Sequence, residues 1–361
     1  MKSISFLLFA AGDCPGGGLK VIYQHANHLA SLGCDVHIVY PAAIDARSSG
    51  FLYKINRFRI FLKRKYKIGF SCRNWFALNE RVKEHWVYSL NYKNVPKTDV
   101  YIATEARTSI YLNQYPIDQS NKYYFIQSYE TWVMNEKKLR ETYRFNLNKF
   151  TIAQWICNIV VNEEKRKCMV VPNGFDFDEY KITIPIQEKN KYEISMLYHQ
   201  HEEKGCRIAI EALKLVKKQI PQLKVFLFGT YKKPDLPEWF HYFEKPNKDL
   251  HLQINNSAAI HIGASSMEGF GLTIGEAMLC GQAVACSDNP GYKEMAIDSQ
   301  TALLSPINDI ETLAKNIIKL ISNDSLRYRL AAAGYEYVRH KFSWEKSYDA
   351  MEKMLKIRVE S

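Results

Sequence analysis

The chain has 361 residues, of which 47% are hydrophobic and 24% are charged, and this globular composition excludes a disordered, collagen-like or coiled-coil protein. The 49 Lys and Arg residues outnumber the 38 Asp and Glu residues by 11, which favours anionic partners such as nucleotides, nucleic acid or an acidic membrane face. No apolar run reaches the roughly 18 residues of a membrane-spanning helix, and eight dispersed cysteines without a Cys-x-x-Cys pair predict free thiols in a cytoplasmic protein without zinc.

The first 40 residues predict the opening of a parallel α/β sheet. An apolar run at 3–9 is followed by Gly16-Gly17-Gly18, by apolar residues at helical spacing from 19 to 29, and by an apolar strand at 35–40. Lys2 and the apolar run also resemble a secretory signal, but the glycine turn and the helix that follow favour a strand. Strand, turn, helix and strand in this order are typical of a βαβ unit.

Further apolar runs and helical periodicity divide the chain into two α/β blocks. The first block has two more predicted strands, at 99–103 and 122–126. In the second, strands are predicted at 194–198, 224–228, 259–262, 284–287 and 301–304, and helices at 205–219, 247–255, 271–280, 309–322 and 325–340. We therefore expect an α/β protein of two doubly wound, Rossmann-like domains, 1–168 and 169–340, which face a cleft and bind ligands at the carboxyl ends of their strands. Residues 341–361 follow, with an amphipathic helix at 344–357.

Basic and apolar residues are interleaved between 51 and 73. Phe51, Leu52, Ile55, Phe58 and Leu62 fall roughly on one helical stripe, and the rest of that helix is basic. Three interpretations are open: the helix lies on an anionic membrane, covers an acceptor site as a flap, or packs its apolar stripe on the first domain. No nucleic-acid partner is expected, because no recognition motif accompanies the charge.

The densest functional signal is the segment SSMEGFGLTIGEAM at 265–278, which follows a predicted strand. Its glycines allow a ligand to approach the backbone, and a helix that begins near Phe270 would direct its first N–H groups at a phosphate. Glu268 in the loop and Glu276 in the helix add two carboxylates that suit vicinal hydroxyl groups. A nucleotide sugar carries both kinds of group, so the segment predicts a nucleotide-sugar site.

Weaker signals accompany this segment. Lys204 follows a predicted strand and precedes a helix, where its ammonium group would meet a phosphate. The loop Gly16–Gly18 resembles a dinucleotide fingerprint but has Val21 where a third glycine belongs, so a structural turn explains it equally well. The Asn-Gly pair at 173–174 indicates a turn, and the Asp-x-Asp triplet at 176–178 follows that turn rather than ending a strand, so no metal site is expected there.

Together these stretches resemble the retaining family-four ("group 1") glycosyltransferases of the GT-B fold. Four of them match in the family's order: the glycine loop with LASLGCDVHIV, then VVPNGFD, EKG at 203–205, and EGFGLTIGEAM at 268–278. The closing FSWEKSYDAM is similar to the family's last helix, which returns to the first domain. The resemblance implies an enzyme that needs no cofactor and no metal and takes a nucleoside-diphosphate sugar as donor.

The resemblance also implies roles for the matching residues. Lys204 would contact the donor diphosphate, Glu268 the transferred sugar, and Glu276 the ribose. Donor binding would further involve Gly17, Gly18, Asn173, Gly174, Gly269, Phe270, Gly271 and Leu272. Backbone N–H groups of Phe270, Gly271 and Leu272 would reach the sugar and phosphate.

Two departures from the family pattern concern the remaining site residues. His199 stands where the family usually has an Arg as a second diphosphate cation, and it would take part in catalysis either neutral or protonated. On the acceptor side the family often has a His, where this chain has Gln127 with Glu130 nearby. The absence of a His at position 127 affects acceptor activation and not the donor site.

The expected reaction is transfer of a hexosyl group to an acceptor hydroxyl with retention of configuration. The resemblance implies a glycan or lipid-linked acceptor in bacterial surface polysaccharide synthesis, in the cytoplasm or on the inner face of the plasma membrane. A nucleotide-sugar epimerase on the same fold and a non-catalytic sugar-nucleotide-binding partner are the alternatives. The incomplete glycine loop makes a dehydrogenase the weakest reading.

Overall fold

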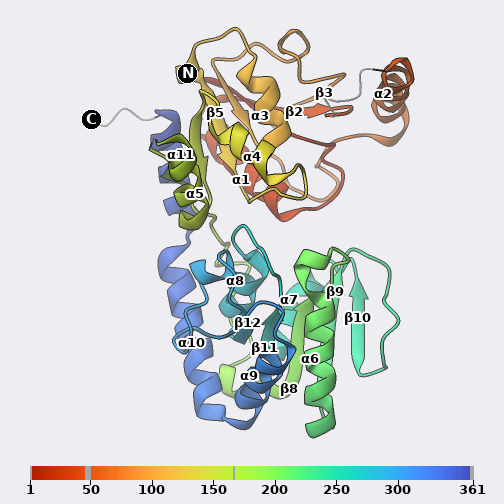
Figure 1. Ribbon diagram of the computed structural model, residues 1–361, viewed down its shortest axis with the longest axis vertical. Coiled ribbons are helices and arrows are strands. Elements are labelled where there is room, and N and C mark those ends of the chain that lie inside the picture. Colours follow the sequence, from red (N-terminus) through yellow and green to blue (C-terminus); the bar gives the residue numbers. More distant parts are fainter. Residues whose placement is uncertain (1, 45–49, 166, 358–361) are drawn as a thin grey trace. The chain divides into compact units, whose positions relative to one another are not determined.

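A computed structural model of the chain describes residues 2–44, 50–165 and 167–357 (Figure 1). The chain divides into two compact units. One consists of Met1–Pro172 together with Ser347–Ser361, and the other consists of Asn173–Lys346. Within the described ranges, every helix is too short or too polar to cross a lipid bilayer.

The first unit is built on a parallel sheet with the order β3-β2-β1-β4-β5-β6-β7. Its strands are β1 (Ser3–Leu7), β2 (Asp35–Pro41), β3 (Lys83–Val87), β4 (Val100–Ala103), β5 (Lys122–Ile126), β6 (Asn148–Thr151) and β7 (Met169–Val170). Its helices are α1 (Gly17–Ser31), α2 (Phe51–Lys63), α3 (Ala106–Asn113), α4 (Glu136–Tyr143) and α5 (Gln154–Glu164). A π-helical turn, η1 (Arg64–Ile68), continues α2 and ends at Gly69, whose φ of 90° is left-handed.

The last helix, α11 (Trp344–Leu355), packs on the first unit through its second half. The His28 ring on α1 stacks on Tyr348 at a centroid distance of 3.9 Å, and its Nε2 lies 2.7 Å from Glu352 Oε1. Lys2 Nζ donates to the Leu355 carbonyl at 2.8 Å. The expected return of the closing helix to the first unit is therefore confirmed.

The second unit repeats the doubly wound plan with the sheet order β10-β9-β8-β11-β12-β13, again all parallel. Its strands are β8 (Asn190–Leu197), β9 (Lys224–Gly229), β10 (Phe240–Glu244), β11 (Ala258–Gly263), β12 (Ala283–Ser287) and β13 (Ala302–Ser305). Its helices are α6 (Cys206–Gln219), α7 (Lys248–Ser257), α8 (Leu272–Leu279), α9 (Ile310–Ser322) and α10 (Asp324–Lys341). Central strand residues such as Ile194, Ile260 and Ala285 are buried in one hydrophobic core with α6 and α9.

Both sheets confirm the expected α/β, doubly wound fold. In each sheet the order of strands reverses once, between β1 and β4 in the first unit and between β8 and β11 in the second. In such sheets a crevice opens at the carboxyl ends of the two strands that flank this reversal, and ligands bind there. The loops that follow β8 and β11 are therefore the place to look for a site in the second unit.

Several elements differ from the sequence prediction. The helix expected near Phe270 begins at Leu272. The helical part of segment 51–73 ends at Ile68, and its apolar stripe is exposed rather than packed, with Leu52 80% and Phe58 53% exposed. The packed interpretation of that stripe is therefore wrong. The sequence also left β3, β6, β7, β10 and helices α3 to α5 unassigned.

Candidate functional site

Two loops meet at the reversal point of the second sheet. Lys204 ends the short 3-10 turn Glu202–Lys204 that follows β8, and Glu268 lies in the loop that follows β11. Lys204 Nζ donates to Glu268 Oε1 at 2.8 Å, and the two side chains are 29% and 15% exposed. A half-exposed cation and a carboxylate thus stand at the position where the fold offers a ligand-binding crevice.

Close backbone packing fixes the Lys204 loop on the end of β11. Gly205 has a left-handed φ of 62°, and a Cβ atom on it would lie 1.9 Å from the Ala264 carbonyl oxygen. Ser266 N donates to the Glu203 carbonyl at 2.8 Å and ties the two loops together a second time. Only glycine fits at position 205, so the loop holds Lys204 beside Glu268.

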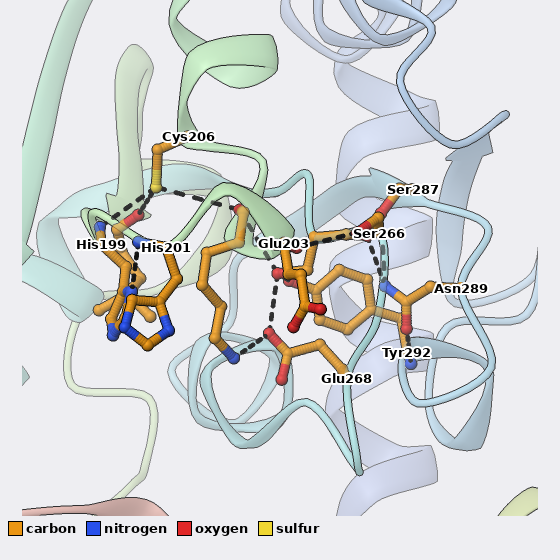
Figure 2. A network of polar contacts seen from close by, with 12 residues as sticks. His199, His201, Glu203, Cys206, Ser266, Glu268, Ser287, Asn289 and Tyr292 are labelled. Carbon is orange, nitrogen blue, oxygen red and sulfur yellow. Dashed lines mark hydrogen bonds and ion pairs between the residues drawn. The ribbon is translucent and has the colours of Figure 1, made fainter. Parts of the chain in front are cut away.

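Glu268 is held from the other side by a network of polar contacts that includes Asn289 and Tyr292 (Figure 2). Ser265 Oγ donates to Glu268 Oε1 at 2.8 Å, and Tyr292 OH donates to Ser265 Oγ at 3.0 Å. The Ser265 carbonyl accepts hydrogen bonds from Ser287 Oγ and from Asn289 Nδ2. Burial raises the pKa of Tyr292 well above its usual value, so this hydroxyl stays a donor.

The helix that follows Glu268 presents its amino end without a side-chain cap. Gly271 precedes α8 with a φ of 86°, and a Cβ atom there would lie 2.6 Å from Tyr292 Cδ1. No side chain in the described part of the chain caps the first turn. Unpaired N–H groups and the helix dipole make such an end favourable for a phosphate.

The other residues predicted to bind the sugar donor offer either a backbone group or a side chain to the ligand. The Phe270 ring is buried between Phe175 and Phe342, at centroid distances of 6.2 and 5.0 Å, so only its backbone is available to a ligand. Gly269 lies in the same loop. Glu276 is half-buried in α8, and its carboxylate adds to the burial that raises the pKa of Tyr180.

His199 stands near Lys204 as a neutral ring. Its Nδ1 accepts a hydrogen bond from His201 N at 3.1 Å, which places the ring hydrogen on Nε2, 3.3 Å from Tyr231 OH. Burial, together with the nearby His201 and Lys204, lowers the pKa of His199 to about 4. At pH 7 the ring therefore offers one N–H group and no positive charge, so it does not replace the family's Arg as a cation.

The segment that begins the second unit packs directly against this site. A Cβ atom on Gly174 would lie 2.6 Å from Trp344 Cα, and a Cβ atom on Gly275 of α8 would lie 2.2 Å from Phe175 Cζ. Asn173 is 2% exposed, and its Oδ1 has no hydrogen-bond partner among the described residues. The sequence prediction that 173 and 174 shape the site's surroundings stays a prediction.

Asp176 has a local structural role. Its Oδ1 accepts hydrogen bonds from the backbone N–H groups of Asp178 and Glu179, both at 3.0 Å, and so closes a turn. In the part of the chain that the structure describes, no three His, Cys, Asp or Glu residues are grouped to hold a metal ion.

The predicted residues of the first unit lie near the carboxyl ends of β1 and β5. α1 begins at Gly17, and a Cβ atom on Gly18 would lie 3.3 Å from Gln127 Oε1, so the two are neighbours. Glu130 is buried, and its Oε2 accepts a hydrogen bond from Ala106 N at 2.7 Å at the start of α3. Burial and the nearby Glu105 raise the pKa of Glu130 well above its usual value. An acceptor role for Gln127 and Glu130 stays a prediction.

Sequence reasoning missed the residues that hold Glu268 in place. Ser265 was part of the quoted motif, but its bond to Glu268 was not foreseen, and Asn289 and Tyr292 stand more than 20 residues away. The signal available was the dipeptide Asn289-Pro290 and Gly291, which indicates a turn after a buried strand. A Cβ atom on Gly291 would lie 2.2 Å from the Glu268 carbonyl oxygen, so this turn supports the Glu268 loop.

Comparison with solved structures identifies the class of the fold. A sucrose-phosphate synthase from Thermosynechococcus elongatus matches with a TM-score of 0.73 at 15% identity and covers 99% of both chains. Anabaena HepE in complex with UDP and glucose also gives a TM-score of 0.73 at 15% identity, over 99% of this chain and 100% of that one. The protein therefore has the GT-B fold.

Sequence comparison matches the second unit to one family. Residues 177–337 match the family described as "Glycosyl transferases group 1", so this part of the chain is a group 1 glycosyl transferase domain. A phosphatidyl-myo-inositol mannosyltransferase from Mycobacterium leprae is 38% identical over 185 residues, which are 48% of this chain and 49% of that protein. An O-antigen chain mannosyltransferase B from Escherichia coli is 33% identical over 108 residues, 30% of this chain and 27% of that protein. The chain spans about half the length of the curated relatives it matches first.

Proposed function

We propose that the protein transfers a hexosyl group from a nucleoside-diphosphate sugar to an acceptor hydroxyl, with retention of configuration and without a metal. The observation that carries the proposal is the Lys204–Glu268 pair, 2.8 Å apart, at the strand reversal, with Glu268 four residues before the uncapped start of α8 at Leu272. The pair offers a cation for a diphosphate and a carboxylate for sugar hydroxyls. Glu276, further along α8, is assigned to the ribose hydroxyls.

The chemistry requires a stabilised leaving group. The bond between the anomeric carbon and the diphosphate oxygen breaks, and a bond forms between that carbon and the acceptor oxygen. The acceptor proton passes to an oxygen of the leaving diphosphate. Lys204 and the N–H groups at the start of α8 neutralise the charge that develops on this group, and each such preorganised donor is typically worth about 2.7–4 kcal/mol.

His199 contributes a neutral N–H group at this place. Its low pKa means that Lys204 is the cation assigned to the diphosphate, with His199 Nε2 and Tyr231 OH as further polar groups nearby. The remaining donor residues, Gly17, Gly18, Asn173, Gly174, Gly269, Gly271 and Leu272, are assigned to shaping the site or to backbone contacts. The acceptor is a glycan or a lipid-linked glycan of a bacterial surface polysaccharide pathway, with Gln127 and Glu130 on its side.

A non-catalytic sugar-nucleotide-binding role is the second candidate, and the neutral His199 is the observation that favours it. One experiment separates the two. The protein is incubated with sugar nucleotides and a glycan or lipid-linked acceptor, and release of the nucleoside diphosphate is followed together with the anomeric signal of the product by NMR. Transfer with retained configuration supports the enzyme. Binding of a sugar nucleotide without turnover on any acceptor supports the second candidate, and an inverted product contradicts the proposed mechanism.

A further inference from the structure

The exposed apolar side chains of the molecule are concentrated in one short segment. Among the described residues, eight large hydrophobic side chains are exposed, and six of them lie between 52 and 68. They are Leu52, Ile55, Phe58, Leu62, Tyr66 and Ile68. A contiguous exposed apolar stripe of this kind marks an interaction surface, because soluble proteins rarely leave one in water.

The opposite side of the same helix is fastened to the first unit. Trp86 Nε1 on β3 donates to the Phe61 carbonyl at 3.0 Å, and the two rings stack at a centroid distance of 6.5 Å. The Arg57 guanidinium lies over the Tyr88 ring, and Arg64 forms a 2.8 Å ion pair with Asp13. α2 therefore keeps its inner side on β3, and the stripe from Leu52 to Ile68 faces away from it. Figure 1 shows α2 at the margin of its unit beside β3.

Positive charge surrounds this exposed stripe. Lys54, Arg59, Lys63, Lys65 and Lys67 are exposed, and residues 50–70 contain no Asp or Glu. An apolar stripe flanked by Lys and Arg fits an anionic lipid surface: the apolar side chains enter the acyl boundary and the long basic side chains reach the headgroups. A protein partner with an apolar groove would have to be strongly acidic as well.

A cavity lies next to the same surface. It has a volume of about 520 Å³ and is lined by Lys65 and Phe70 after α2, by His85 and Trp86 of β3, and by Lys93. Two lysines and the aromatic residues in this lining suit a phosphorylated headgroup. The Glu84 carboxylate, which also lines the cavity, is paired with Arg73 Nε at 3.0 Å.

We propose that the stripe from Leu52 to Ile68 and this cavity form a surface that binds anionic membrane lipid. The stripe enters the bilayer, and the cavity takes a lipid phosphate. This surface is separate from the Lys204–Glu268 site and needs no sugar transfer to work. The surface also selects an acceptor that is carried by a membrane lipid. This last statement rests on the proposed function.

Flotation of the full chain with vesicles tests the surface. We expect binding to vesicles of phosphatidylcholine with phosphatidylglycerol, and weaker binding to phosphatidylcholine alone. Phe58→Asp should lower the partition coefficient about 10-fold or more, because burying one large apolar side chain is worth about 1.5–3 kcal/mol. Trp132→Asp is the matched control, since Trp132 and Phe58 are both 53% exposed, and it should bind vesicles like the wild type.

The charged groups are tested in the same assay. Each basic residue near an anionic surface is worth about 1 kcal/mol, so Lys54→Gln and Lys93→Gln should each weaken binding about fivefold. Lys97→Gln is the control for Lys93, because the Lys97 ammonium group bonds the Tyr92 carbonyl and lies on the Tyr92 ring. If Lys93→Gln binds vesicles as strongly as the wild type, the cavity is not part of the lipid-binding surface.

Two outcomes overturn the proposal as a whole. One is the absence of flotation with anionic vesicles. The other is an oligomer, seen by light scattering, that Phe58→Asp dissociates while vesicle binding is unchanged, since a second copy of the chain would then cover the stripe. Donor binding is measured separately, so loss of flotation with intact nucleoside-diphosphate binding rejects this surface alone. Flotation without donor binding rejects the proposed function alone.

Discussion

Gly205→Ala tests whether the loop that carries Lys204 depends on contact with β11. The added Cβ atom would lie 1.9 Å from the Ala264 carbonyl oxygen, so the loop has to move by about 1.1 Å to reach even 3.0 Å. A displacement of about 1 Å at a reacting group costs on the order of a hundredfold in rate. Left-handed backbone at an alanine adds about 1–2 kcal/mol of strain. We therefore expect turnover to fall about a hundredfold and the second unit to lose stability.

Gly69→Ala is the matched control for this variant. Gly69 also has a left-handed φ, 90°, but a Cβ atom there would meet no atom within 4 Å. With a ψ of 173° its backbone lies in a region that residues other than glycine rarely adopt, so Gly69→Ala should carry strain of about 1–3 kcal/mol and still keep wild-type turnover. Initial rates with a sugar nucleotide, together with urea unfolding curves, measure both effects. Wild-type turnover by Gly205→Ala would refute the argument that this contact positions Lys204.

Three further predictions concern single side chains. Lys204→Ala should lower turnover on the order of a hundredfold. Lys214→Ala, which removes an exposed ion pair with Glu211, should leave turnover unchanged. Equal turnover in the two variants would contradict the role assigned to Lys204. Burial lowers the pKa of His261 from 6.5 to about 3. Below pH 6.5 the unfolded chain therefore binds a proton at this residue, whereas the folded chain does not. This difference lowers the unfolding free energy of the wild type by about 2 kcal/mol between pH 7.5 and pH 5. In urea melts, the unfolding free energy of His261→Gln should fall by about 2 kcal/mol less over the same range. The same pH dependence in the variant and the wild type would contradict this prediction. The pKa of Glu130 is raised in the folded state, so this residue makes the wild type less stable as pH rises above about 4.5. Glu130→Gln should therefore gain stability relative to the wild type between pH 5 and pH 8. The opposite trend in the same urea melts would mean that Glu130 is ionised in the folded chain.

Strands with continuous apolar runs could be predicted from the sequence. β11 (AAIHIG) and β12 (AVACS) are buried throughout, and such runs are typical of central parallel strands. β6 (NKFT) was hidden by its polar residues, although it is largely buried and the Lys149 ammonium group is bound by backbone carbonyls. β3 (KEHWV) and β10 (FHYFE) are edge strands with half-exposed, charged residues, so the alternation that marks a strand is weak.

The separate parts of the candidate site were predictable, but their contacts were not. Lys204 and Glu268 were each singled out by local context, yet they are 64 residues apart and meet only because β8 and β11 are neighbours. The neutral state of His199 depends on burial and on the bond from His201 N, neither of which a sequence displays. The apolar stripe on α2 has the helical spacing that is typical of a buried face. Only the structure reveals that the stripe is exposed and that the opposite side of α2 contacts β3.

Thermal unfolding with UDP, GDP, dTDP and NAD, each in the presence of EDTA, tests the central claim most directly. A ligand present at about 100 times its dissociation constant adds about 2.7 kcal/mol to the free energy of unfolding. The account predicts that at least one nucleoside diphosphate raises the melting temperature, that EDTA does not abolish the shift, and that Lys204→Ala does. A shift with NAD alone, or none with any nucleoside diphosphate, would contradict the claim that the Lys204–Glu268 site binds the donor.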